Sequence, residues 1–419
     1  MQSAEVVIVF LLTYLLMAAG RLPWVQVDRT GIALLGVIAL LGLGAVTIDD
    51  VAGNIDTATL ILLFALMMIS AQFATSGLLD SGVNWLIGLN GGPALLLGAT
   101  VAVCGIFSAV LANDILLFGM TPLLIAGVRR RGLDPRPFVL ALAAATNAGS
   151  AATLIGNPQN IAIGQMGNLG FWTFIAACGV PAALALGVVF GVLWFRWRDR
   201  MVTTEVLPPD LPEVPFHPYD RVQTLKGVIS VVVMLIFFTT GFPREIVALL
   251  IAAVLLTSRK VTSRTMIGAV DWPLLLLFAC LFAVTGALHD TGIPWSVISP
   301  LEEHGLMPDN LALLTPLTLL MSNTIGNVPS VILLLQVWPD PPQGALYALA
   351  LLSTLAGNLL LVGSLANLIV AERAASYGVR ITFAEHARVG IPITLISMAL
   401  AFIWLAYWGW LPVFSMGAG

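Results

Sequence analysis

Charged side chains are scarce in this sequence of 419 residues, where Asp, Glu, Lys and Arg together make up 10%. Soluble domains carry about 25% charged residues, so the shortage leaves apolar runs too long for a surface that faces water. A hydrophobic fraction of 59% and a mean hydropathy of +0.98 agree with this reading. We therefore predict a polytopic membrane protein, which excludes a cytosolic enzyme, a nucleic-acid-binding protein and a secreted disulfide scaffold.

Cysteine and histidine are also rare, with three and four residues. Cys104, Cys178 and Cys280 lie singly in apolar runs without metal-ligand or disulfide spacing, and we expect them to be small buried side chains. The histidines lie near loops or the ends of apolar runs. The sequence has no group of His or Asp residues at membrane depth of the kind that an intramembrane enzyme would need. We expect no enzymatic activity and no cofactor.

Twelve apolar runs organise the chain. The first, Ala4 to Ala19, has no Lys or Arg before it and is expected to be a span rather than a cleavable signal. The runs 31–46 and 244–257 are shorter than the about 20 residues that a crossing helix needs, so we expect them to extend into their flanks. Polar residues interrupt the runs 93–128 and 310–336, which we expect to fold back as hairpins. The other runs cover about 58–79, 137–163, 171–195, 224–242, 272–289, 343–371 and 389–413.

The positive charges predict the orientation of these spans. If both hairpins return to their own side and the other ten runs cross once, 17 of the 18 Lys and Arg residues fall on one face. Only Arg244 lies opposite. Cytoplasmic loops carry the Lys and Arg excess, so this face is predicted to be inside and both termini outside. A re-entrant hairpin and a pair of full crossings give the same sidedness, so the charges leave both open.

An internal repeat divides the sequence into two halves. A shift of 215 pairs Arg29 with Arg244 and Asp56 with Asp271, and a shift of 214 pairs Asn113 with Asn327. The charge pattern gives the halves opposite orientations, and inverted halves are the architecture of many secondary transporters. The predicted fold class is an all-α polytopic membrane protein, with five spans and one re-entrant hairpin per half. Its predicted parts are repeat 1 at 1–198 with the cytoplasm-opening hairpin 93–128, a Pro-containing cytoplasmic linker at 199–223, and repeat 2 at 224–413 with the outward-opening hairpin 310–336.

Gly, Pro and uncharged polar residues gather in four segments, 111–114, 146–160, 322–330 and 357–367. A Gly or Pro that stops a helix frees backbone groups, which are costly in hydrocarbon unless they are buried or line a cavity. Small polar residues also serve as packing contacts between membrane helices. Their matching positions in an inverted repeat favour a binding site instead. The candidate substrate-binding residues are Asn113, Asn147, Gly149, Ser150, Thr153, Asn157, Asn160, Asn327, Ser330, Asn358, Ser364 and Asn367. A sodium site, if present, is predicted at Asn113, Gly149 and Asn157.

Asp114 is the one carboxylate clearly inside an apolar run and beside a predicted helix break. An ionisable residue within the membrane is a functional hypothesis by default. Burial favours the protonated acid and a bound cation favours the carboxylate, so Asp114 could couple transport to a proton. The alternative role is to neutralise the dipole at a helix start. Asp56 and Asp271 begin spans and are expected to be N-caps. No Lys or Arg is expected at membrane depth, which suits a neutral substrate.

The polar segments resemble those of the ion transporter superfamily, which includes arsenite permeases, sodium-coupled dicarboxylate and sulfate symporters, and some sodium/proton antiporters. The resemblance covers nearly the whole chain. Its most specific parts are Ala112-Asn113-Asp114 with Thr121-Pro122, Asn147–Ser150 with Gly156–Asn160, Asn327–Ser330, and Gly363–Asn367. It implies two re-entrant hairpins meeting two unwound helices, in a homodimer whose transport domain moves like an elevator against a scaffold.

The first hairpin tip decides between branches of the superfamily. Ala112-Asn113-Asp114 looks like the arsenite-permease version, where dicarboxylate symporters have Ser-Asn-Thr. The segment from Gly156 to Asn160 is closer to generic anion permeases. Ser322-Asn323-Thr324 spells the symporter motif at the second tip, yet Asn327 pairs with Asn113 in the repeat and is preferred.

The resemblance and the residues together predict proton-coupled efflux of arsenite or antimonite in a bacterial inner membrane, with Asp114 as the coupling carboxylate. The alternatives are sodium-coupled symport of a small anion such as a dicarboxylate or sulfate, and sodium/proton antiport. A channel would need a continuous polar pore. The expected partners are a small inorganic or carboxylate solute, a proton or sodium ion, the lipid bilayer and a second copy of the chain, with no nucleic acid.

Overall fold

The computed structural model describes residues 2–19, 26–202 and 217–414, and within these ranges the chain forms helices and no strand. The helices of the first half are α1 (Gln2–Ala19), α2 (Arg29–Gly42), α3 (Ile48–Asn54), α4 (Thr57–Thr75), α5 (Leu78–Gly88), α6 (Pro93–Ser108), α7 (Asn113–Arg130), α8 (Arg136–Ser150), α9 (Pro158–Met166) and α10 (Phe171–Trp197). This helical content confirms the predicted fold class.

The second half repeats the same order of long and short helices. Its helices are α11 (Arg221–Phe237), α12 (Arg244–Leu256), α13 (Ser263–Gly268), α14 (Trp272–Asp290), α15 (Ile293–Glu303), α16 (Leu311–Thr324), α17 (Asn327–Val337), α18 (Gln343–Ala356), α19 (Leu365–Ser376) and α20 (Phe383–Tyr407), with a 3-10 turn at Leu361–Gly363. Each helix from α1 to α10 therefore has a counterpart ten places later.

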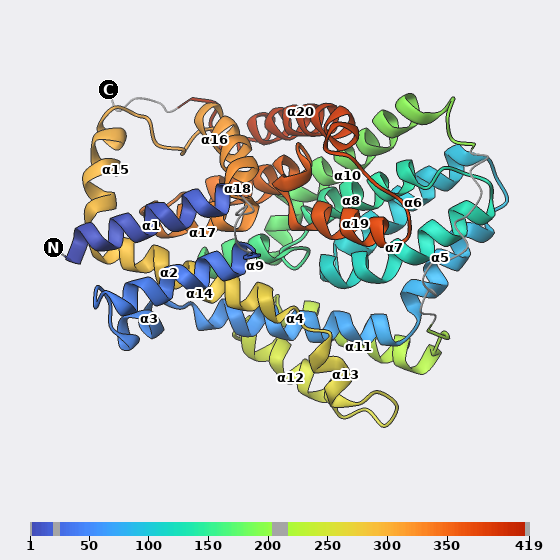
Figure 1. The fold of residues 1–419 in the computed structure, drawn as a ribbon, viewed down its shortest axis with the longest axis horizontal. Coiled ribbons are helices and arrows are strands. Elements are labelled where there is room, and N and C mark those ends of the chain that lie inside the picture. The colour runs from blue at the N-terminus through green and yellow to red at the C-terminus, as the bar shows by residue number, and fades with distance from the viewer. Residues whose placement is uncertain (1, 20–25, 203–216, 415–419) are drawn as a thin grey trace.

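The two halves point in opposite directions. Helix α5 lies at one end of the long axis of the molecule, and its counterpart α15 lies at the other end (Figure 1). The hairpin α6–α7 lies towards the α5 end, whereas α16–α17 lies towards the α15 end (Figure 1). The N-terminal end of α1 lies at the α15 end (Figure 1), and Leu311 N of α16 donates to Pro412 O (2.8 Å). Among the described residues, the start of α1 and Pro412 therefore both lie near the α15 end of the molecule.

The counterpart helices α4 and α14 begin with the same kind of N-cap. Asp56 Oδ1 accepts a hydrogen bond from Thr59 N at the start of α4, and Asp271 Oδ1 accepts one from Leu274 N at the start of α14, both at 3.0 Å. An N-cap carboxylate satisfies a backbone amide that has no partner within the helix, and its loss costs about 1 kcal/mol. The prediction that both aspartates are N-caps is confirmed.

Helices α2 and α12 are shorter than the sequence predicted. Four of the described helices, α4, α10, α14 and α20, are long and apolar enough to cross a membrane alone. Helices α2 and α12 have 14 and 13 residues and span about 20 Å, against a hydrocarbon core of about 30 Å. The expected extension into their flanks is wrong. Helix α2 packs on α14, and α12 packs on α4, so one face of each short helix is covered by a helix of the opposite half.

The helices form two groups through their contacts. In one group, α10 packs on α20, α7 on α19 and α17 on α9, so the hairpin arms of each half contact the broken span of the other. In the other group, α2 packs on α14 and α12 on α4. We call α6–α10 with α16–α20 the hairpin group and α1–α5 with α11–α15 the scaffold group. The two groups contact each other where α5 packs on α7, α17 on α14 and α9 on α4.

Several predicted features lie at or beyond the limits of the described residues. Most of the predicted linker, with Pro208 to Pro215, and Arg21 lie outside them. Helix α11 begins at Arg221, slightly before the predicted end of the linker. The three cysteines are buried and unpaired, as expected.

Candidate functional site

Two spans are broken at corresponding places. Helix α8 ends at Ser150 and α9 begins at Pro158, while α18 ends at Ala356 and α19 begins at Leu365. In the first break, Asn160 Nδ2 donates to Ser150 O (3.1 Å) and Thr153 O (3.0 Å). In the second, Asn367 Nδ2 donates to Gly357 O (2.8 Å) and Leu360 O (3.2 Å). The repeat-equivalent asparagines therefore satisfy the carbonyls that each break sets free.

The two breaks meet at Asn147. Asn147 Nδ2 donates to Asn358 Oδ1 (2.8 Å) and Asn367 Oδ1 (3.1 Å), and Ser364 Oγ donates to Asn147 Oδ1 (3.1 Å). All four side chains are buried. The sequence predicts these four residues in one site, and the structure brings them together across the two halves.

A second set of contacts joins the breaks through Asn157. Its Nδ2 donates to Ser150 Oγ (3.1 Å) and to Thr354 Oγ1 (3.2 Å). Gln159 Nε2 also donates to Thr354 Oγ1 (3.3 Å). Thr354 and Gln159 were not among the predicted site residues. The repeat held a signal for Thr354, because a shift of 208 aligns it with Thr146 in the first polar segment.

The first hairpin tip lies beside the end of α8. Asn113 Oδ1 accepts from Ser108 Oγ (2.9 Å), and the same hydroxyl donates to Thr146 O. Ala112 N donates to Ser70 Oγ (2.8 Å) of α4. Because the tip contacts the middle of the broken α8–α9 span, the hairpin turns back inside the molecule. This geometry favours a re-entrant hairpin over two full crossings.

The second hairpin tip reaches the other break. Asn323 Nδ2 donates to Ala356 O (2.9 Å), and Asn323 Oδ1 is buried without a hydrogen-bond partner. Asn327 Nδ2 lies 3.5 Å from the position that a Cβ on Gly357 would take. Asn323 and Asn327 therefore both lie at the second break, although only Asn327 was predicted.

Two predicted site residues, Gly149 and Ser330, contact backbone atoms of neighbouring segments. A Cβ on Gly149 would lie 2.2 Å from Gly105 O, so this glycine allows α8 to touch the backbone of α6. Ser330 Oγ donates to Gly326 O (2.6 Å) one turn into α17. Both residues shape the hairpins against the broken spans.

Arg29 contacts the second break, although the sequence pattern places no Lys or Arg at membrane depth. Arg29 Nη2 donates to Val362 O (3.2 Å), and its Nη1 lies 2.8 Å from the position of a Cβ on Gly326. Gly326 has a φ of +98° at the turn of the second hairpin, a backbone conformation that favours glycine. Arg29 begins the short helix α2 and is half-buried, so its guanidinium reaches the second hairpin turn from the start of that helix.

Asp114 lines a cavity of about 520 Å³ between the two helix groups. Asp114 is half-buried in the first turn of α7, and among the described residues it has no hydrogen-bonded or ion-paired partner. Asp271, the N-cap of α14, lines the same cavity. So does Asp80, which is buried and accepts from His217 N (2.9 Å). The polar side chains in the lining are Asp80, Asp114, Asp271, His217 and Arg373.

His386 is a buried titratable residue that sequence analysis missed. It lies in the first turn of α20, with Nε2 3.2 Å from Asn358 O and 3.5 Å from Asn367 Nδ2. Its place near the end of an apolar run suggested an interfacial residue. The break between α18 and α19 instead places the Asn358 carbonyl within hydrogen-bond distance of the His386 ring.

The assembled centre is built from uncharged polar side chains, with the Arg29 guanidinium at its edge beside the second hairpin turn. Asparagine, glutamine, serine and threonine side chains link both breaks and both hairpin tips, with one acidic cavity on the Asp114 side. Among the described residues, no cluster of three or more His, Cys, Asp or Glu side chains could hold a metal ion. Such a centre can donate and accept hydrogen bonds to a small hydroxylated solute.

Comparisons with known proteins agree with this architecture. A sequence profile described as "Citrate transporter" (CitMHS) matches residues 12–340. The chain is 29% identical over 434 residues to a "46 kDa membrane protein" of Mycobacterium leprae, covering 97% of this chain and 99% of that one. It is 26% identical over 458 residues to the "Silicon efflux transporter LSI3" of Oryza sativa subsp. japonica, covering 92% and 94%.

A solved structure shares the fold. The YdaH transporter of Alcanivorax borkumensis, described as having an unusual topology, superposes with a TM-score of 0.61 at 14% identity, covering 98% of this chain and all of that one. Because the family profile covers well over half of the chain, the protein belongs to the citrate transporter family and is a membrane transporter of the anion-permease kind.

Proposed function

We propose that this protein is a proton-coupled efflux transporter for a small hydroxide that is neutral at pH 7, of which arsenite and antimonite are the expected substrates. The observation that carries the proposal is the pairing of an uncharged hydrogen-bonding centre with a single unpartnered carboxylate, Asp114, beside it. In this scheme the centre binds the solute, and Asp114 takes up and releases the coupling proton.

The charges around the site favour a neutral substrate. Three carboxylates and one guanidinium line the cavity that leads to Asp114, so a polyvalent anion would be repelled there. A solute such as arsenite carries hydroxyl groups that the asparagine amides can both donate to and accept from. The silicon efflux relative from rice supports the export of a small solute by this fold.

The two helix groups suggest how access alternates. The cavity at Asp114 lies between α4, α5 and α14 of the scaffold group and α7 of the hairpin group. Sliding the hairpin group along the scaffold group would close this cavity and open one on the opposite face, which is an elevator movement. The protein is expected to work as a homodimer in the bacterial inner membrane, with the α5 face cytoplasmic.

Sodium-coupled symport of a small anion is the second candidate. The family description supports it, and Arg29 at the second hairpin turn supplies a positive charge that a carboxylate or sulfate could use. Freed carbonyls and the amides of Asn113 and Asn157 supply the oxygens that a sodium ion would need. Sodium/proton antiport at Asp114, without another substrate, is a third candidate.

A flux assay in reconstituted vesicles separates these candidates. Arsenite, sulfate and a dicarboxylate are offered in turn under a proton gradient alone and a sodium gradient alone. We expect arsenite flux that a proton gradient drives and that sodium leaves unchanged. Sulfate or dicarboxylate uptake that requires sodium would overturn the proposal in favour of the symporter.

A further inference from the structure

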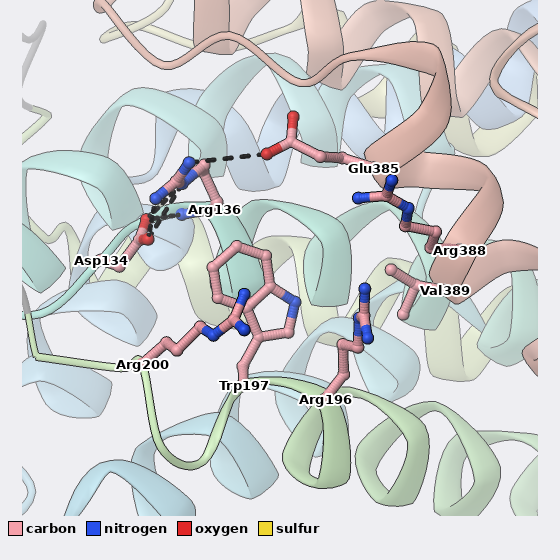
Figure 2. A pocket seen from close by; sticks show the side chains of 8 residues that line it. All are labelled: Asp134, Arg136, Arg196, Trp197, Arg200, Glu385, Arg388 and Val389. Atoms are coloured by element: carbon pink, nitrogen blue, oxygen red, sulfur yellow. Dashed lines mark hydrogen bonds and ion pairs between the residues drawn. The ribbon is translucent and has the colours of Figure 1, made fainter.

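A basic pocket lies on the face predicted to be cytoplasmic, away from the transport site. Arg196 and Trp197 end α10, Arg200 lies just beyond it, and Arg388 comes from the second turn of α20 (Figure 2). Arg136 at the start of α8 closes one side (Figure 2). The pocket has a volume of about 150 Å³.

The acidic side chains of the pocket are already engaged by one arginine. Arg136 Nη2 lies 2.6 Å from Asp134 Oδ2, and Arg136 Nη1 lies 3.5 Å from Glu385 Oε1. Arg196, Arg200 and Arg388 make no ion pair with any residue that the structure describes. In the pocket, four arginines therefore face only two carboxylates, Asp134 and Glu385, and the excess of positive charge attracts an anion.

An indole donor lies in the wall of the same pocket. Trp197 Nε1 is buried and has no hydrogen-bond acceptor, although buried polar groups are normally paired. The ring lies under the Arg136 guanidinium, whose Cζ is 5.3 Å from the ring centroid, and its nitrogen faces the side of Arg196 (Figure 2). An unpaired N–H beside guanidinium groups is the donor set that binds a phosphate.

An apolar groove continues from the pocket along the membrane-facing side of α10 and α20. It shares Arg196 and Arg388 with the pocket, has a volume of about 480 Å³, and is otherwise lined by Val188, Gly191, Val192, Phe195, Pro392 and Ile396. A small soluble anion has no apolar part that this groove could bury. An acyl chain would fill it and bury its apolar surface.

We propose that the pocket and groove bind one anionic phospholipid. Its phosphate lies between Arg196, Arg388 and Trp197 Nε1, and one acyl chain follows the groove between α10 and α20. Basic pockets between membrane helices on the cytoplasmic side are suited to anionic headgroups, because that leaflet carries the anionic lipids. Since α10 and α20 both belong to the hairpin group, the bound lipid would stabilise that group and travel with it.

The headgroup contact is tested by the thermal stability of the detergent-purified protein titrated with phosphatidylglycerol and, separately, phosphatidylcholine. We expect phosphatidylglycerol alone to raise the melting temperature. In the variant carrying Arg196→Gln and Arg388→Gln, we expect the half-saturating concentration to rise roughly thirtyfold, since each charge contributes a factor of about five. A variant carrying Arg259→Gln and Arg264→Gln, which removes two exposed charges elsewhere on the same face, should keep the wild-type response. Equal responses from both variants, or no response of the wild type, would overturn the proposal.

The groove is tested by filling it. A Cβ on Gly191 or Gly187 of α10 meets nothing within 4 Å, so Leu fits at either position, but only Gly191 lines the groove. We expect Gly191→Leu to weaken the response to phosphatidylglycerol and Gly187→Leu to leave it intact. Inorganic phosphate should not stabilise the protein at matching concentrations. Stabilisation by phosphate alone that is indifferent to Gly191→Leu would make this a soluble-anion site and refute the lipid.

Discussion

Asn147 is the side chain that joins the two halves of the molecule. Its amide donates to Asn358 and Asn367 and accepts from Ser364, all of which come from the second half. These groups are buried, so removing the amide leaves several of them without partners. The cost of an unsatisfied buried polar group is about 1–3 kcal/mol.

We therefore expect Asn147→Ala to lower the free energy of unfolding by about 1–3 kcal/mol. Thermal unfolding in detergent measures this as a lower melting temperature, with Asn90→Ala in an exposed loop as the control. A melting temperature equal to that of the control would show that the network adds nothing to stability.

The hairpin tips give a prediction for binding. Asn113 and Asn327 are repeat equivalents, and each lies beside one break of the central network. If both contact the substrate, Asn113→Ala and Asn327→Ala should each weaken arsenite binding by about tenfold, the value of one hydrogen bond. Calorimetric titration of the purified variants with arsenite measures this loss of affinity. Wild-type affinity in either variant would contradict a site shared by the two tips.

At the residue scale, the site residues that could be predicted are those marked by the internal repeat. Asn147, Asn157, Asn160, Asn358, Ser364 and Asn367 could be named from Gly- and Pro-interrupted polar segments in matching positions, and the structure brings them together. Arg29 and His386 could not, because both stand at the ends of apolar runs. Whether such a residue faces headgroups or the interior depends on how deep its helix begins.

At the scale of elements, the close approach of α6 and α8 holds the first hairpin against the broken span. Gly149 faces the backbone of Gly105, where a Cβ would collide with a carbonyl that cannot move aside like a side chain. Small residues permit such crossings in membranes because attraction between helices depends on contact.

Gly149→Ala is accordingly expected to destabilise the protein by about 1–3 kcal/mol, the usual cost of overpacking. Gly187→Ala on α10 is the matched control, because a Cβ there meets nothing within 4 Å. The melting temperatures of the two variants in the same detergent decide the outcome. A melting temperature of Gly149→Ala that matches Gly187→Ala would mean that the two helices separate at little cost.

Element lengths show where sequence patterns fail. The apolar runs near α2 and α12 were expected to grow to the length of a bilayer, yet these helices stop at 14 and 13 residues. Hydropathy counts apolar residues along one segment. It cannot register that α14 and α4 from the opposite half pack on these short helices.

At the scale of the whole molecule, the cavity at Asp114 lies towards the face that carries α5 and His217. Ile115 lines this cavity, whereas Ile332 on α17 is fully buried, and the native cysteines are buried too. A membrane-impermeant thiol reagent should therefore label Ile115→Cys from the predicted cytoplasmic side and leave Ile332→Cys unlabelled. Labelling of Ile115→Cys from the opposite side only would reverse the proposed orientation.

The inverted arrangement of the whole chain was predictable because charge placement and the repeat are both global patterns. The repeat set the order of the helices, and the Lys and Arg residues set the opposite directions of the halves. Substrate identity was not predictable in the same way, because neutral amides and hydroxyls bind many small solutes.

The most direct test of proton coupling is the internal pH of vesicles that contain the reconstituted protein. When an outward arsenite gradient is imposed without sodium, the internal pH should change in step with arsenite release. The change should vanish in Asp114→Asn and persist in Asp56→Asn, which keeps an N-cap outside the cavity. A pH change of wild-type size in Asp114→Asn would show that the proton takes another route, and the account of Asp114 would be wrong.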